Sequence, residues 1–195
     1  RQTVCIQTGT TTELNLADFF RLNGISYEAL PIETNDEGKE NLFAGRCDVY
    51  TTDASGLSST RAAAANPNKW VVLPEIISKE PLGPLVRHGD HQWGDVVRWS
   101  LNAMIIAEEL GVTSENVDAQ KSSNVPEVLR LLGVEGSYGE MLELAPDWAY
   151  QIIKQIGNYS ESYEANVGPD TPLEIARGLN ALWTQGGILY APPFR

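Results

Sequence analysis

Residues 5–20 read CIQTGTTTELNLADFF and indicate the class of fold. The stretch begins as an apolar strand and, from 11 to 22, continues with apolar residues at helical spacing. Between them lie Gly9 and three consecutive threonines, Thr10, Thr11 and Thr12. A strand that turns directly into a helix is the opening unit of an α/β fold.

The next sixty residues repeat this alternation. Strands are expected at 26–33, 47–53 and 69–75, and helices at 35–44 and 54–66. Short helices between strands predict a mainly parallel sheet covered on both faces. We therefore expect an α/β lobe over residues 1–80.

The composition changes after this lobe. Residues 81–90, PLGPLVRHGD, have the prolines and glycines of an extended hinge or connector. Residues 91–195 predict a helical region. Its helices are expected at 93–110, from Ser114, and at 125–133, 145–157 and 171–187, and a proline stands at the expected first turn of each of the last three. All five tryptophans of the chain, four of them in this region, fall on apolar faces and are expected to pack in the core.

The length, charge and composition of the chain exclude few classes of function but weigh against two, nucleic-acid binding and membrane binding. The chain has 195 residues, a net charge of −12 and 42% hydrophobic residues, typical of a globular protein of one or two domains. The negative charge disfavours nucleic acid and anionic membrane surfaces. No apolar run reaches the ~20 residues of a membrane helix. The N-terminal RQTVCIQ has no apolar signal stretch and reads as a start inside a fold.

Cysteine occurs twice, at Cys5 and Cys47, both in expected strands. Neither has C-x-x-C spacing, so a zinc ribbon or thioredoxin-like motif is not supported. Two buried free thiols are one interpretation. Neighbouring parallel strands would also bring the pair within disulfide reach, which would indicate an oxidising compartment.

Two polar features follow strands of the expected sheet. Thr10–Thr12 precede a helix, so their amides and hydroxyls could bind a carboxylate, or one threonine could simply cap the helix. Asp53 follows a later strand and could accept hydrogen bonds from an ammonium or cap the next helix. Because ligands bind beyond the carboxyl ends of parallel strands, the two features together suit the zwitterion of an α-amino acid.

Several longer motifs resemble one family. They are QTGTTTE, AGRCDVYTTD, VVLPEIISKEPLGPLVRHGD, AEELGVTSENVD, NVGPDTPLEIARGLNALWTQGG and YAPPFR, and they cover nearly the whole chain. Together they resemble the second lobe and following region of periplasmic general L-amino-acid-binding proteins, the type II solute-binding components of polar amino-acid ABC transporters.

The resemblance implies roles for named residues. Thr11 would bind the ligand α-carboxylate, with Thr10 as an adjacent contact, and Asp53 would bind the α-ammonium. It also implies a disulfide between Cys5 and Cys47, periplasmic localisation, an L-amino acid ligand and a permease partner. The N-terminal part of the first lobe, which the family has, is expected to be absent, and residues 91–195 would belong to the remnant of that lobe.

Other functions were weighed against this one. A cyclohexadienyl dehydratase-like enzyme has the same fold, but we can nominate no acid/base residue, so no enzymatic activity is expected. A non-binding assembly module is the other alternative. His88 and His91 flank Asp90 without a third ligand, so a solvated loop is expected there, with no metal and no cofactor. The apolar stripes of the helical region favour a homodimer.

Overall fold

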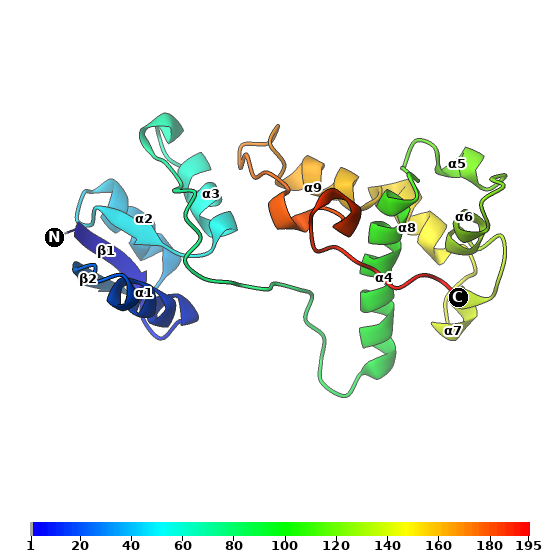
Figure 1. The fold of residues 1–195 in the computed structure, drawn as a ribbon, viewed down its shortest axis with the longest axis horizontal. Helices are drawn as coiled ribbons and strands as arrows, with labels where there is room; N and C mark the ends of the chain where they lie inside the picture. The colour runs from blue at the N-terminus through cyan, green and yellow to red at the C-terminus, as the bar shows by residue number, and fades with distance from the viewer. Residues whose placement is uncertain (1) are drawn as a thin grey trace. The chain divides into compact units, whose positions relative to one another are not determined.

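The computed structural model describes residues 2–195, which form two units (Figure 1). The sheet unit comprises the described residues up to Leu82 together with Pro172–Ile175. The helical unit comprises Gly83–Thr171 and Ala176–Arg195. No helix within residues 2–195 is long and apolar enough to cross a membrane.

The sheet unit contains a parallel sheet of three strands, in the order β2-β1-β3. The strands are β1 (Gln2–Gln7), β2 (Tyr27–Ile32) and β3 (Val49–Thr51), and the helices between and after them are α1 (Thr11–Leu22), α2 (Asn35–Phe43) and α3 (Ala54–Ala62). The predicted α/β class, its parallel sheet and these six elements are confirmed.

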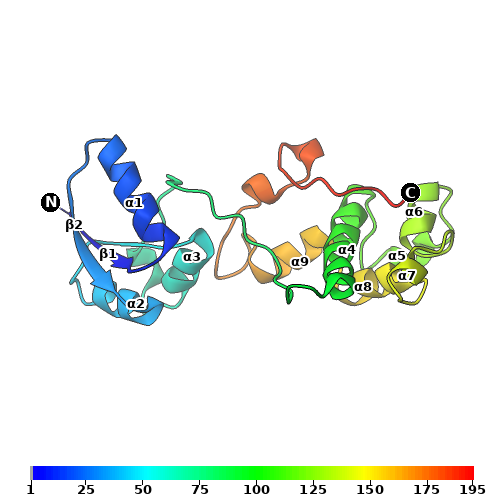
Figure 2. The same cartoon turned by 90° about the horizontal axis from the view of Figure 1, so that it is seen from below.

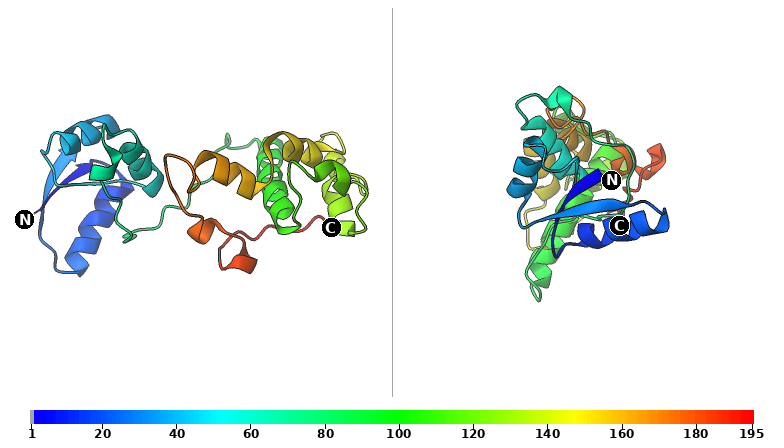
Figure 3. Two further views of the ribbon diagram at one scale, coloured as in Figure 1. Left: turned by 90° about the horizontal axis from the view of Figure 1, so that it is seen from above. Right: turned by 90° about the vertical axis from the view of Figure 1, so that its left-hand side faces the viewer.

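Both faces of the central strand are buried. Val4 and Ile6 pack with Leu16 of α1. Cys5 points to the opposite face, where Leu42 of α2 and Leu57 of α3 complete a second cluster. Figure 2 and Figure 3 show α1 on one side of the strands and α2 and α3 on the other. This two-sided cover explains why the middle of β1, Val4–Cys5–Ile6, is continuously apolar and buried rather than alternating.

The two cysteines form a disulfide. Cys5 and Cys47 are joined with their Cα atoms 5.7 Å apart, and they are the only cysteines of the chain. Cys5 lies in β1, and Cys47 lies just before β3, which pairs with β1. The bond therefore fixes β3 beside the central strand, and the interpretation with two free thiols is wrong.

The strand predicted at 69–75 is not formed. A short 3₁₀ helix, η1 (Pro67–Lys69), occupies its start, and residues 70–75 pair with no strand among residues 2–195. Val71 and Leu73 are largely exposed. The apolar pattern is that of a strand, but a strand also needs a neighbour to receive its backbone hydrogen bonds.

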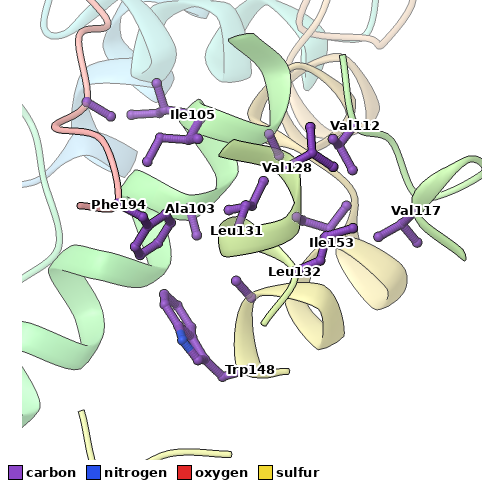
Figure 4. Packing of buried hydrophobic residues seen from close by; sticks show 14 of the residues in the cluster. Ala103, Ile105, Val112, Val117, Val128, Leu131, Leu132, Trp148, Ile153 and Phe194 are labelled. Atoms are coloured by element: carbon purple, nitrogen blue, oxygen red, sulfur yellow. The ribbon is translucent and has the colours of Figure 1, made fainter. Parts of the chain in front are cut away.

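The helical unit is built around one long helix, α4 (His91–Glu109), which packs against α6, α8 and α9. The other elements are α5 (Val117–Gln120), α6 (Pro126–Leu131), α7 (Tyr138–Met141), α8 (Trp148–Ile156), α9 (Tyr159–Asn166), η2 (Gly178–Asn180) and η3 (Trp183–Gln185). Figure 4 shows aliphatic side chains from these helices converging on Ile153 and Leu131, with Trp148 and Phe194 at one end.

Two expectations for this region are wrong, and one of its helices was not predicted. Residues 171–187 form no α-helix but an irregular segment with η2 and η3, and Pro172–Ile175 belong to the sheet unit. The helix α9 was missed, although Asn158 and Glu161 form a capping box at its start. Trp93 and Trp183 are about half exposed rather than packed in the core.

Candidate functional site

The predicted site residues lie at the carboxyl ends of β1 and β3. The chain leaves β1 toward β2 on one side and returns to β3 on the other, so these two ends flank the point at which the strand order reverses. Ile6 of β1 lies opposite Thr51 of β3. The turns that follow therefore leave the sheet side by side, which is where open α/β sheets bind ligands.

Thr10 is the N-cap of α1. Its hydroxyl oxygen accepts a hydrogen bond from the Glu13 amide at 3.3 Å and donates to the Gln7 carbonyl at 2.7 Å. Gly9, at φ +71°, donates its own amide to Glu13 Oε2 at 2.9 Å. The capping interpretation is therefore correct for Thr10, whose hydroxyl already has partners in both directions.

Thr11 and Thr12 leave hydrogen-bond donors at the start of the helix. Their backbone N–H groups have no acceptor among residues 2–195, as expected for the first turn of a helix. Thr11 Oγ1 donates to Glu80 Oε1 at 3.4 Å, and Asn15 Nδ2 donates to the same oxygen at 3.2 Å. This end of α1 thus presents two amides, a hydroxyl and a carboxamide to a carboxylate, and the helix dipole favours the negative charge.

Asp53 supplies a negative charge at the start of α3, in contrast to the hydrogen-bond donors at the start of α1. It is the N-cap of α3, and its Oδ1 accepts hydrogen bonds from the Gly56 amide at 2.8 Å and the Ser55 hydroxyl at 2.5 Å. The bond from Ser55, more than that from Gly56, lowers the pKa of this carboxyl against the opposing effect of partial burial. Asp53 is therefore ionised at neutral pH, and its Oδ2 has no hydrogen-bond partner in the described chain.

Two contributors to this site were missed from the sequence. Asn15 lies one turn after Thr11, so the i, i+4 spacing within the helix could have indicated it. Glu80 reaches the helix from 69 residues away, and no local signal in the sequence predicts such a contact.

The chemistry available here is binding by charge and hydrogen bonds. Donors gather at α1 and an ionised acceptor lies at α3, at one edge of the sheet. The histidines are elsewhere: His91 is the first residue of α4, and Asp90 caps that helix rather than lying in a free loop. Residues 2–195 contain no group of three or more side chains suited to a metal ion.

Comparison with curated proteins finds close relatives. The glutamate/glutamine/aspartate/asparagine-binding protein BztA of Rhodobacter capsulatus is 56% identical over 194 residues, 99% of this chain. The general L-amino acid-binding periplasmic protein AapJ of Rhizobium johnstonii is 55% identical over 98% of the chain. The putative amino-acid ABC transporter-binding protein YhdW of Escherichia coli is 54% identical over 99%. The chain spans 57% of the length of each of these proteins.

A solved structure agrees with these relatives. The ABC transporter periplasmic binding protein from Brucella ovis with glutathione bound matches the whole chain with a TM-score of 0.94 and 51% identity, and the chain covers 61% of it. No protein-family profile matches the chain. The resemblance to amino-acid-binding proteins of ABC transporters, and the periplasmic-binding-protein fold, are confirmed.

Proposed function

We propose that the chain carries the amino-acid site of a periplasmic receptor that delivers its ligand to the permease of an ABC uptake transporter. Thr11 and Thr12, next to the cap Thr10, would bind the α-carboxylate through their free amides and the Thr11 hydroxyl. Asp53 would bind the α-ammonium through Oδ2. Residues 1–80 would form the second lobe of the receptor, 81–90 its hinge, and 91–195 part of the first lobe.

One observation carries the proposal. Free donors of a helix N-terminus and an ionised carboxylate with an open oxygen flank the same strand-order reversal, between β1 and β3. This pairs each charge of an α-amino acid with its opposite. The relatives support the choice of ligand, since each is named as an amino-acid-binding protein or as a binding protein for named amino acids.

The proposed ligand class is broad. The two proposed contacts recognise only the carboxylate and the ammonium, which all α-amino acids share. Each charge-assisted contact contributes about 1.5–3 kcal/mol at best, and immobilising the ligand costs a comparable amount. We therefore expect this chain alone to bind L-amino acids with dissociation constants in the millimolar range.

Nuclear magnetic resonance detects binding of this strength. Titration with L-glutamine should shift the amide signals of Thr11, Thr12 and Gly56. Asp53→Asn should weaken binding about tenfold, because the charge is lost while asparagine still caps α3. The matched control is Asp90→Asn, which changes the equivalent cap of α4 outside the site and should leave the affinity unchanged.

Other outcomes would contradict the proposal. Saturable binding that is equally strong in Asp53→Asn would place the ammonium site elsewhere. Shifts confined to the helical unit would exclude the sheet edge as the binding site. Micromolar affinity that Asp53→Asn abolishes would support the site but refute the expectation that it is weak in this chain.

We propose in addition that the chain forms a homodimer through its helical unit. The segment after Ala176 exposes four large apolar side chains to solvent, a patch of the kind that usually marks an interface: Leu179, Trp183, Ile188 and Tyr190. Light scattering at micromolar concentration should give about twice the chain mass of 21.4 kDa. A monodisperse monomer would contradict this proposal without affecting the binding site.

A further inference from the structure

A carboxylate of the chain itself already lies at the proposed carboxylate site. Glu80 Oε1 accepts from the Thr11 hydroxyl and the Asn15 carboxamide at the first turns of α1. We infer that Glu80 is an internal competitor that occupies the carboxylate subsite, and that an amino-acid ligand must displace it. This inference rests on the proposed function, and concerns how that same site is regulated.

Ion pairing does not explain the position of Glu80. Within residues 2–195 no lysine or arginine lies within salt-bridge distance of its carboxylate. Its two partners are neutral groups of α1, and the positive end of the helix dipole is the remaining attraction. The features that hold Glu80 are thus those that would hold the α-carboxylate of a ligand.

The contact between Glu80 and α1 is weak enough for a ligand carboxylate to replace it. Both distances, 3.4 and 3.2 Å, are at the long end for hydrogen bonds, and the contact is exposed to water. Three residues earlier, Ile77 packs against the buried cluster of Val4, Ile6 and Leu16 between β1 and α1. This anchor keeps Glu80 near the site after release and gives it a high effective concentration there.

Displacement of Glu80 would also affect residues outside the site. Glu80 lies two residues before Leu82, where the chain leaves the sheet unit. Ligand binding would release Glu80 and the two residues after it from α1, while Ile77 stays packed. Occupancy of the site would therefore be coupled to the mobility of the connector that follows. A competitor that is bound for most of the time raises the apparent dissociation constant by the inverse of the unoccupied fraction.

The test compares two substitutions in one segment. Glu80→Ala removes the competitor and should tighten L-glutamine binding by about three- to fivefold, the factor for a subsite vacated roughly a quarter of the time. The control is Glu75→Ala, which removes the same charge from the same segment, where Glu75 is exposed and makes no hydrogen bond or ion pair within residues 2–195. It should leave the affinity unchanged. Equal tightening in both variants would mean that net charge alone acts, and would overturn the inference.

A second probe separates this inference from the proposed function. Acetate has a carboxylate but no ammonium, so it should shift the Thr11 and Thr12 amide signals at lower concentration in Glu80→Ala than in the unmodified chain. If acetate behaves in this way but no amino acid binds, Glu80 competes for the carboxylate subsite as inferred, and the proposed function is wrong. Amino-acid binding that is unchanged or weaker in Glu80→Ala would overturn the inference, and a weaker one would make Glu80 a ligand contact.

Discussion

The ion pair between Arg177 and Glu108 should be the most sensitive polar contact of the helical unit. Arg177 Nη2 lies 3.0 Å from both carboxylate oxygens of Glu108, and the two side chains are only 16% and 9% exposed. The same guanidinium donates to the Asn180 carbonyl and lies over the rings of Tyr159 and Tyr163. It thereby holds the irregular C-terminal segment against α4 and α9.

The cost of removing Arg177 follows from this geometry. Arg177→Ala leaves the Glu108 carboxylate buried with no other cation in ion-pair distance within residues 2–195. Breaking a buried pair in this way costs 3–5 kcal/mol, and we take the lower end, about 3 kcal/mol, because Arg177 retains some exposure. Arg177→Lys keeps the charge but loses the planar fork and its stacking, so an intermediate cost of about 1–2 kcal/mol is expected.

Urea unfolding followed by tryptophan fluorescence measures this effect, because four of the five tryptophans lie in the helical unit. A loss of about 3 kcal/mol should lower the urea midpoint by roughly 1–2 M. The control is Arg98→Ala, which breaks an exposed pair with Asp95 inside α4 and should cost less than about 0.5 kcal/mol. The reasoning would be refuted if Arg177→Ala cost no more than this control.

Three further outcomes are expected, each measurable by urea unfolding. Replacing Cys5 and Cys47 by serine should lower the free energy of unfolding of the sheet unit by about 4 kcal/mol, because the bond closes a loop with a sequence separation of 42; unchanged stability under reducing conditions would contradict this. Because the pKa of Asp53 is lowered, its carboxylate stabilises the folded state at pH values above the unfolded pKa near 3.8, and this stabilisation is lost as the pH falls through the folded pKa. The part of the free energy of unfolding that is lost below about pH 4 for this reason should be absent in Asp53→Asn. Gly38→Ala should cost about 1–3 kcal/mol despite the better helix propensity of alanine, since a Cβ there would lie 2.6 Å from a neighbouring side chain, whereas Gly94→Ala, with its nearest neighbour at 3.6 Å, should be neutral or stabilising by up to about 1 kcal/mol.

The elements that the sequence predicted correctly are those determined by local signals. Gly24, Gly45 and Gly111 each take a positive φ just after a helix, a conformation that glycine adopts readily and that commonly ends a helix. The parallel sheet followed from the alternation of strands and helices. Those signals need no knowledge of which residues meet in space.

The elements that failed depend on distant partners. Residues 69–75 have the composition of a strand, but they pair with no neighbouring strand among residues 2–195. Residues 171–187 have helical spacing, yet Glu174 adopts a φ of +52° and binds Arg61 of α3 at 2.6 Å. Further on, Arg177 binds Glu108 of α4. Such long-range contacts outweigh the few tenths of a kcal/mol by which local propensity favours a helix.

At the candidate site, capping and binding are divided between neighbouring atoms. Thr10 uses its hydroxyl to cap α1. A single cap satisfies only part of the first turn, so the amides of Thr11 and Thr12 have no acceptor among the described residues 2–195. Asp53 caps α3 with Oδ1, and its Oδ2 accepts no hydrogen bond from the part of the chain that the structure describes. From sequence, a cap and a ligand contact are competing interpretations of the same residue types. In the structure they are compatible, because the cap fixes the backbone that presents the free donors and the remaining oxygen. A substitution that removes the cap should therefore weaken ligand binding as well as the helix. Asp53→Asn preserves the cap, so it should weaken binding while the folded state loses only the stabilisation that depends on the charge of the carboxylate.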